Sequence, residues 1–433
     1  MNADARPLLS LDEALARLVA GAVPHAIVQT ESVSTFDALG RVLAAEVLSA
    51  LDVPPEDNSS MDGYALHAAS VPAAGTVLTV SQRIPAGVPG EPLQPGTAAR
   101  IFTGGQVPPG ADAIVMQEEC DALPAQNPGE LGQVRVNVMP QHGQWIRRRG
   151  EDVRLGSAVL HRGERLTPQA LGMAASVGAA LLPVVRRPRV ALFSTGDEIR
   201  TLGQPLDPGC VYDSNRYSLM GALQRLGMEV VDLGLVRDDP QALHSVLEQA
   251  TARADAVVTS GGVSMGDADH TRDVLAQRGQ VAFWKVAMRP GRPFAFGPLR
   301  RSASADGSTA DVAGAQAPVW LFALPGNPVA ALVTFYVFAR EALLSLAGAT
   351  ATPLPVLQAR CLTPIRKRPG RTEFQRAIVE PGPAGWQVRL TGSQGAGVLR
   401  SMSEANALVV LGHEQASVAA GDLVDVWLFD GLT

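Results

Sequence analysis

The chain has 433 residues, which at roughly 100–200 residues per domain predicts two to four domains. Hydrophobic residues make up 46% of it and aromatic residues only 5%, so we expect sizeable, mainly aliphatic cores. The formal net charge of −6 disfavours a general nucleic-acid binder, because such proteins usually carry a basic surface.

Cysteine usage and the lengths of the apolar runs exclude further classes. Cys120, Cys210 and Cys361 are odd in number and far apart, which argues against a disulfide framework and against a zinc or iron–sulfur site. No uninterrupted apolar run reaches the ~18 residues of a membrane-spanning helix, since Arg340 and Glu341 break the closest candidate. We therefore expect a soluble cytoplasmic protein with neither membrane nor nucleic-acid partners.

The first 48 residues are predicted to be mainly helical. Ser10 can cap a helix that runs to Val19, and apolar residues recur along one face of it. A second helix is expected over residues 35–44.

Residues 49–150 differ, because short β-rich runs alternate with Gly and Pro and turn residues recur every eight to twelve positions. This pattern predicts a small β-rich domain. Helical spacing returns in TPQALGMAASVGA, so we expect residues 151–185 to rejoin 1–48 in a discontinuous helical linker domain.

Residues 186–350 alternate apolar runs with helical patterns. Strands are expected at RVALFS, MEVVDLGLV, DAVVTS, VAFWKVAM and VWLFAL, and Asp239 is expected to cap a helix. The alternation predicts a central, doubly wound α/β domain with a parallel-rich sheet covered on both faces. Residues 299–318, rich in Ser, Ala and Gly, are expected to form a flexible loop. Residues 351–433 are again β-rich and predict a C-terminal barrel-like domain.

Ligands of open α/β sheets bind beyond the carboxyl ends of the strands, and the unusual loops of the central domain all follow its strands. In SGGVSMGDADHT, Gly261 and Gly262 permit close approach of a ligand to the backbone. Ser260, Ser264 and neighbouring amides can then cradle a phosphate. The alternative is an ordinary strand–turn–helix connection, which the density of Gly, Ser and Asp disfavours.

The segment PGNP, which precedes a predicted helix, is a second candidate anion site. Pro325 and Pro328 restrict φ, Gly326 permits unusual backbone angles, and the free N–H groups after Asn327 favour an anion. A well-capped helix is the alternative interpretation.

Acidic residues gather in the same loops. They form the pairs Asp197 and Glu198, Asp238 and Asp239, and Asp267 and Asp269. Because carboxylates repel phosphate, an anion site beside them needs a cation, and Mg²⁺ takes oxygen ligands. Each acid alone could equally be a helix cap or a surface charge.

Basic residues occur in WKVAMRPGRP. Lys285 and Arg289 lie four apart along a strand-like run, which places their side chains on the same face, and Arg292 follows in a Pro-Gly turn. They can hold phosphate or another oxyanion, although solvated strand-end charges remain an alternative. Taken alone, Asp62, Thr103 and Asp152 are expected to be turn-forming residues.

Nine motifs, in order along the chain, resemble the molybdopterin molybdenumtransferase family, which is related to the C-terminal domain of gephyrin. They are NSSMDGYA, FTGGxxPxGADAIVMQE, RRRGEDV, FSTGDEI, YDSNRYSL, SGGVSMGDADHT, PGRPFAFG, LPGNPVA and RTEFQR. The resemblance implies four domains, an elongated homodimer and an active site shared between subunits. It also implies a reaction in which adenylylated molybdopterin and molybdate give molybdenum cofactor and AMP, with Mg²⁺.

The resemblance also implies functional residues. The catalytic set is Asp62, Thr103, Asp152, Glu198, Asp238, Asp269, Lys285 and Arg289, of which Glu198, Asp238 and Asp269 hold the metal. The loop prolines Pro325 and Pro328 and, later in the chain, Arg371 join the binding residues. We also expect transient contacts with the adenylylating enzyme and with molybdoenzymes.

The chain departs from the family pattern at two positions. Arg289 stands where the family often has Lys, and a planar guanidinium is not equivalent to an ammonium. Ala396 stands where Ser is expected. Two other functions stay open: a gephyrin-like scaffold that clusters partners, and adenylyl transfer onto molybdopterin.

Overall fold

The protein is described by a computed structural model that covers residues 8–125, 127–262, 270–302 and 317–432. Three predicted site residues, Ser264, Asp267 and Asp269, lie outside the described residues, as does most of the predicted loop at 299–318.

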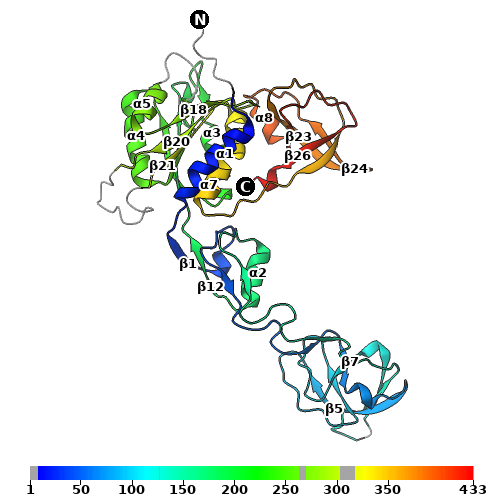
Figure 1. Ribbon diagram of the computed structural model, residues 1–433. Coiled ribbons are helices and arrows are strands. Elements are labelled where there is room, and N and C mark those ends of the chain that lie inside the picture. Colours follow the sequence, from blue (N-terminus) through cyan, green and yellow to red (C-terminus); the bar gives the residue numbers. More distant parts are fainter. Residues whose placement is uncertain (1–7, 126, 263–269, 303–316, 433) are drawn as a thin grey trace.

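The molecule is elongated (Figure 1). The central α/β region and the C-terminal β region lie side by side at one end, and the β-rich region lies at the other. Between them is a small linker module formed by β1 (Thr30–Ser34), β12 (Leu181–Val185) and α2 (Pro168–Ser176). Thr167 caps α2 by accepting a hydrogen bond from the Ala170 N–H.

The central sheet has the strand order β16-β13-β17-β21-β20-β18. Its strands are β13 (Arg189–Thr195), β16 (Glu229–Val236), β17 (Ala256–Ser260), β18 (Ala282–Lys285), β20 (Pro293–Leu299) and β21 (Val319–Leu324). The first four in the order are parallel, and β20 and β18 continue the sheet antiparallel. The predicted parallel-rich sheet is therefore confirmed, with β20 as a strand that the sequence pattern did not suggest.

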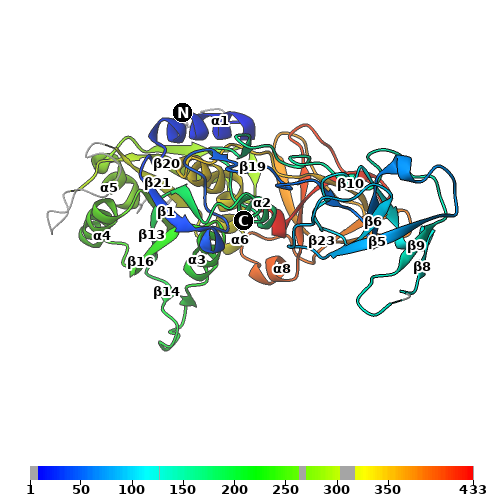
Figure 2. The ribbon, with the colours of Figure 1, turned by 90° about the horizontal axis from the view of Figure 1, so that it is seen from below.

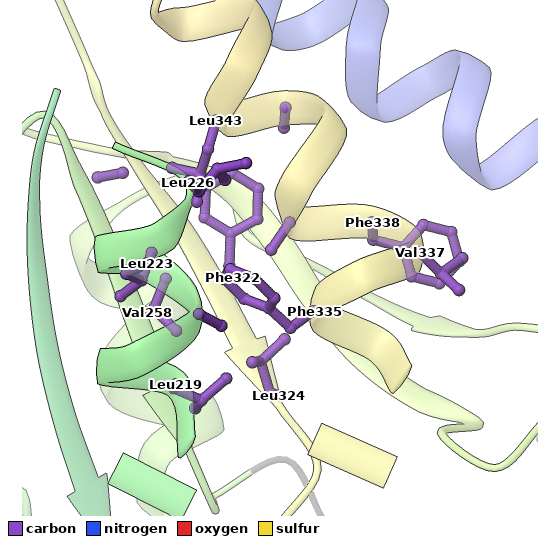
Figure 3. Packing of buried hydrophobic residues seen from close by; sticks show 14 of the residues in the cluster. Leu219, Leu223, Leu226, Val258, Phe322, Leu324, Phe335, Val337, Phe338 and Leu343 are labelled. Atoms are coloured by element: carbon purple, nitrogen blue, oxygen red, sulfur yellow. The ribbon is translucent and has the colours of Figure 1, made fainter. Parts of the chain in front are cut away.

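Helices cover both faces of this sheet. They are α3 (Asn215–Arg225), α4 (Pro240–Arg253), α5 (His270–Arg278), α6 (Pro328–Thr334), a π-helical segment Phe335–Ala339 and α7 (Arg340–Leu346). Successive side chains of β13 point to opposite faces of the sheet. Leu192 packs with α3, α6 and α7, while Phe193 packs with α4 and α5. Figure 3 shows the first core, where Leu223 of α3 lies near Phe322 of β21.

The continuous helical stretch Pro328–Leu346 is long and apolar enough to cross a bilayer by length and composition. Within the protein, however, 78% of that window is buried. A core helix that packs on a sheet has this same composition, so the stretch is weak support for a membrane span.

The β-rich region is built on a sheet with the order β7-β4-β6-β5-β9-β8. Its strands are β4 (Gly63–Leu66), β5 (Thr76–Ile84), β6 (Thr97–Ile101), β7 (Ala113–Met116), β8 (Cys120–Leu123) and β9 (Gln133–Val136). Two short pairings lie on either side of its junction with the linker. β2 (Val47–Leu48) pairs with β11 (Ala158–Leu160) within the linker segments, and β3 (Asn58–Ser59) pairs with β10 (Ile146–Arg147) within the β-rich region.

The C-terminal region forms the predicted barrel. Its strands are β22 (Leu357–Cys361), β23 (Thr372–Gly382), β24 (Gly385–Leu390), β25 (Ala407–Leu411) and β26 (Leu423–Leu428), with α8 (Leu399–Ser403) before β25. The order β23-β24-β22-β26-β25 closes because β25 also pairs with β23. An apolar interior fills the ring, and the predicted multidomain α/β plus β fold is confirmed.

Two expectations about the N-terminal part are wrong. The predicted helix at 35–44 is only a 3₁₀ turn, Thr35–Asp37, because Gly40 at φ 72° ends helical geometry and Val42 and Leu43 enter β-bridges. The first helix, α1 (Leu11–Ala22), packs against α7 in the central core and not beside α2, because its apolar stripe fills that core.

We predict that Leu223→Ala lowers the stability of the central domain by about 2–5 kcal/mol, because the side chain is fully buried and a cavity would remain. Calorimetric melting of the full chain measures the effect. The matched control Leu206→Ala, at a position 49% exposed, should leave the melting temperature nearly unchanged. Equal shifts for the two variants would contradict the assigned core.

Candidate active site

A cavity of about 720 Å³ lies at the carboxyl ends of the parallel strands. Loops after β13, β16, β17 and β21 contribute to its wall, and Gly397 and Leu399 from the C-terminal region close one side. Predicted site residues in the wall are Glu198, Asp238, Ser260, Gly261, Gly262, Gly326, Asn327 and Pro328. The structure thus brings together the loops that strand order alone had suggested would meet.

Asn215, at the start of α3, ties two of these loops together. Its side-chain Nδ2 donates to Ser260 Oγ at 2.6 Å and to the Gly326 carbonyl at 2.7 Å. Ser260 Oγ in turn donates to the Pro325 carbonyl at 3.3 Å. Sequence reasoning missed Asn215 as a site residue, although its motif, YDSNRYSL, places a polar side chain at a helix start that faces the strand ends.

Gly261 explains how closely the loops pack. Its φ is +96°, and a Cβ there would lie 2.2 Å from the Thr195 carbonyl oxygen. A Cβ on Gly326 would lie 3.9 Å from the Gly261 Cα, so the two glycine loops touch at the floor of the cavity. Any side chain at position 261 would force the ends of β13 and β17 apart.

The acids of the cavity differ in their surroundings. Glu198 is exposed, and its carboxylate folds back toward Gly196, where a Cβ would lie 2.8 Å from Glu198 Oε2. Asp238 is half-buried in the same wall. Asp239 is a helix cap, since its carboxylate accepts from the Gln241 and Ala242 amides.

The fit of the cavity to a cation rests on its oxygen atoms. Asn215 Oδ1 and Thr195 Oγ1 are buried in the wall and have no hydrogen-bond partner among the described residues. Together with the carboxylates of Glu198 and Asp238, they form an oxygen-rich donor set of the kind that Mg²⁺ prefers. The described residues do not bring three His, Cys, Asp or Glu side chains to one point, and the third predicted ligand, Asp269, lies outside them.

The predicted run of Lys285 and Arg289 along one strand is wrong. β18 ends at Lys285, and Met288–Arg289 forms β19, which joins the C-terminal sheet beside Glu373 of β23. The chain therefore changes sheets between the two residues, and a spacing of four no longer fixes a common face. Lys285, Arg289 and Arg292 lie outside the wall of the cavity, and their proposed roles stay predictions.

Arg371 belongs to the same C-terminal neighbourhood as Arg289. Its Nε donates to Glu373 Oε1 at 3.0 Å, and Gln375 Nε2 donates to the other oxygen of that carboxylate at 3.0 Å. Arg371 therefore neutralises a buried acid and lies outside the wall of the cavity.

Arg376 fixes the loop that closes the cavity from the C-terminal side. Its buried guanidinium donates to the Gly395 carbonyl at 3.1 Å and to Ser401 Oγ at 3.1 Å. Burial, with Arg289 nearby, lowers the pKa of Arg376 to about 10. The Ala396 carbonyl, one residue on, accepts from the Val329 amide of α6, and this contact needs no hydroxyl at position 396.

Asp62 and Thr103 form a pair in the β-rich region. Both the amide and the hydroxyl of Thr103 donate to Asp62 Oδ1 at 2.8 Å. These bonds hold the pKa of the Asp62 carboxyl below its ordinary value, with a smaller contribution from Arg100. Asp152 is exposed nearer the linker, where its amide donates to the Val53 carbonyl.

Within one chain, these three residues do not reach the cavity. The β-rich region that carries Asp62 and Thr103 lies at the opposite end of the molecule from the central sheet in Figure 1, and beyond the C-terminal barrel in Figure 2. The structure therefore brings the loops of the central domain together and leaves the acids of the β-rich region apart.

Three family models match successive parts of the chain. They are the MoeA N-terminal region (domains I and II) over residues 9–178, a probable molybdopterin binding domain over 191–345, and the MoeA C-terminal region (domain IV) over 358–429. A molybdopterin molybdenumtransferase of Haemophilus influenzae is 37% identical over 428 residues, covering 98% of this chain and 100% of the relative. The chain belongs to the molybdopterin molybdenumtransferase family.

Further comparisons agree. Molybdopterin molybdenumtransferase 2 of Mycobacterium tuberculosis is 37% identical over 407 residues, covering 92% of this chain and 94% of the relative. The crystal structure of a molybdopterin biosynthesis moeA protein from Pyrococcus horikoshii OT3 matches with a TM-score of 0.79 at 27% identity, covering 98% of this chain and 100% of that one. The predicted resemblance to the molybdopterin molybdenumtransferase family is confirmed.

We predict that Asn215→Ala loosens both glycine loops of this molybdopterin molybdenumtransferase family member. The loss of two buried hydrogen bonds should cost about 1–3 kcal/mol, because Ser260 Oγ and the Gly326 carbonyl lose their donor. Hydrogen exchange at the amides of Gly261 and Gly262 should become faster. Ser214→Ala is the control, since Ser214 lines the same cavity but makes no capping bond. Unchanged hydrogen exchange in both variants would contradict the role of Asn215 in holding the two glycine loops together.

We also predict that Thr103→Val raises the pKa of Asp62 toward its ordinary value. The hydroxyl bond stabilises the ionised carboxylate and is lost in the variant, while the amide bond remains. Carbon-detected NMR titration of the Asp62 carboxyl measures this change. Thr97→Val, which removes a hydroxyl that bonds only the Gln94 carbonyl, should leave the pKa of Asp62 unaltered.

Proposed function

We propose that this protein inserts molybdenum into adenylylated molybdopterin, using molybdate and releasing AMP, to give molybdenum cofactor. The observation that supports this most directly is the cavity at the carboxyl ends of β13, β16, β17 and β21, which has both acids and exposed backbone. Its volume of about 720 Å³ lies in the range of small-molecule sites. The names of the related proteins support the same reaction.

The charge of the cavity supports a metal-assisted reaction. Its wall includes Glu198, Asp213 and Asp238, and the described residues that line it include neither Lys nor Arg. An adenylylated pterin carries a pyrophosphate, which these acids would repel unless a cation lay between them. We propose that Glu198, Asp238 and Asp269 hold Mg²⁺, which when bound supplies positive charge to the pyrophosphate.

The residues of the chain then position the substrate. The backbone at Gly261, Gly262 and Gly326 admits the phosphates closely. The start of α6 adds little to this, because Pro328 has no N–H and the Val329 amide already donates to the Ala396 carbonyl. Asp213 accepts from Ser194 Oγ at 3.1 Å and from the Arg216 Nε at 3.2 Å. It is thereby neutralised and holds the turn before α3, so the chemistry falls to the other two acids.

Hydrolysis of the phosphorus–oxygen bond of the adenylyl group consumes one water and frees AMP. The two dithiolene thiols of the pterin bind molybdenum through sulfur, and their two protons leave with one displaced oxygen of molybdate as water. The sulfurs belong to the substrate, so the protein contributes orientation and charge compensation. We propose that Lys285, Arg289, Arg292 and Arg371 receive the molybdate oxyanion on the C-terminal side of the cavity.

The proposal includes a homodimer. Asp62, Thr103 and Asp152 belong to parts of the chain that do not reach its own cavity, so a second copy would have to supply them. A cytoplasmic location and transient contacts with the adenylylating enzyme and with molybdoenzymes complete the proposal.

We predict that Glu198→Gln and Asp238→Asn each reduce AMP release by about tenfold or more and raise the Mg²⁺ concentration needed. The assay combines purified protein, adenylylated molybdopterin and molybdate over a Mg²⁺ series. Glu229→Gln is the matched control, because Glu229 is exposed and lies at the amino end of β16, whereas Asp238 follows the carboxyl end of the same strand.

Wild-type rates of AMP release in both acidic variants would contradict the proposed role of Glu198 and Asp238 in holding the metal. Absence of AMP release by the wild-type protein would contradict the proposed reaction. A parallel incubation with ATP and unmodified molybdopterin separates the alternative of adenylyl transfer, for which we expect no product. A gephyrin-like scaffold would instead bind a stoichiometric protein partner without turnover.

A further inference from the structure

A second cavity, of about 800 Å³, lies where the linker module meets the central domain. Its wall includes Arg165 before α2, Arg187 between β12 and β13, Arg225 at the end of α3, and Arg340 at the start of α7. None of its lining residues belongs to the wall of the acidic cavity. Four arginines from separate segments thus converge in a chain whose net charge is −6.

Two of these arginines are already paired. Arg340 contacts Glu341, and Arg225 lies 3.8 Å from the fully exposed Asp430. Both acids belong to the same wall, so they account for two of its four positive charges.

Arg165 and Arg187 form no ion pair with an acid among the residues that the structure describes. Arg165 Nη2 donates to the Arg225 carbonyl at 3.1 Å, and Arg187 Nη1 donates to the Gly227 carbonyl at 2.9 Å. A guanidinium has five N–H donors, so these bonds leave most of each fork available.

Both side chains are half-buried, which is costly for a cation without an acid. Burial lowers the pKa of Arg165, and the charge of Arg340 lowers it further. Burial likewise lowers the pKa of Arg187, with Arg41 adding to the effect against the weaker opposing charges of Glu31 and Glu229. An anion in the cavity would relieve both costs at once.

We propose that this cavity is a binding site for a small phosphate-bearing molecule, held by Arg165 and Arg187. A phosphate dianion matches two guanidinium forks in charge and in planar hydrogen-bond geometry. Thr167, which caps α2, and Pro168, which begins it, line the same wall, so the positive end of this helix adds to the field. The volume accommodates a phosphorylated sugar as well as free phosphate.

The site joins two parts of the molecule. Arg165 and α2 belong to the linker module, whereas Arg187 leads directly into β13 and contacts the end of α3 through Gly227. A bound phosphate would therefore bridge the linker and the central domain, and its affinity should fall when either Arg165 or Arg187 is replaced.

The test is isothermal titration of the full-length protein with inorganic phosphate and, separately, with ribose 5-phosphate. Mg²⁺-free buffer is used, because the acidic cavity then repels both probes. We expect saturable binding to the wild-type protein, a roughly tenfold weaker Kd in Arg165→Gln and in Arg187→Gln, and no saturation in the double variant. Arg225→Gln, which removes an exposed arginine already opposite Asp430, should stay within about twofold of wild type. Stronger binding of ribose 5-phosphate would identify a phosphorylated metabolite as the ligand class, and equal binding would identify phosphate alone.

Melting temperatures separate a binding site from a packing role. In phosphate-free buffer the double variant should melt no lower than wild type, and only wild type should gain stability on addition of phosphate. A large loss of melting temperature without phosphate would make the arginines packing residues and overturn the proposal. Equal phosphate binding by wild type and the double variant would overturn it as well. So would a wild-type protein that binds no phosphate, with variants whose only effect is to dissociate an oligomer.

Discussion

The contact between Gly261 and the end of β13 is the constraint on which the candidate active site depends. The ends of β13 and β17 approach each other this closely because position 261 has no side chain, since a Cβ there would lie 2.2 Å from the Thr195 carbonyl oxygen. Asn215 then fixes the third loop by bonding Ser260 and Gly326 together. The close approach at Gly261 and the buried side-chain amide of Asn215 thus hold separate strand ends together as one wall of the cavity. Glu198 and Asp238 lie on this wall.

Much of this arrangement was predictable because it follows from local pattern and strand order. Continuous apolar runs such as Arg189–Thr195 indicate strands that are buried on both faces, and their alternation with helices indicates which strand ends carry the loops. The helix predicted at 35–44 failed because spacing alone did not reveal that Gly40 adopts a positive φ. The position of α1 failed for a different reason, since an apolar stripe shows that a helix is buried but not which core receives it.

The site was predictable in part. Ser260 ends a strand, the glycines, Glu198 and Asp238 follow strands, and the topology of the sheet brings them to one cavity. Lys285 and Arg289 could not be placed, because the chain leaves one sheet and enters another between them, and pairing with β23 is a long-range contact without a local pattern. Asn215 was missed because its function lies in two hydrogen bonds to loops distant in sequence. Asp62 and Thr103, which are 41 positions apart in the sequence, form a hydrogen bond, yet both lie far from the cavity of their own chain.

Charge gives the two cavities opposite chemistry within one acidic chain. Acids line the first, so under our proposal an anionic substrate enters it together with a cation, and its affinity would then depend on the metal. Arginines line the second, where two of them are half-buried without acids among the described residues, so an anion is favoured there without a metal. Under the two proposals, removal of the metal would weaken substrate binding in the acidic cavity and leave anion binding in the arginine cavity intact. The arginine cavity lies between the linker and the central domain. An anion bound there would therefore affect how the linker orients the β-rich region, with its acids, relative to the central domain.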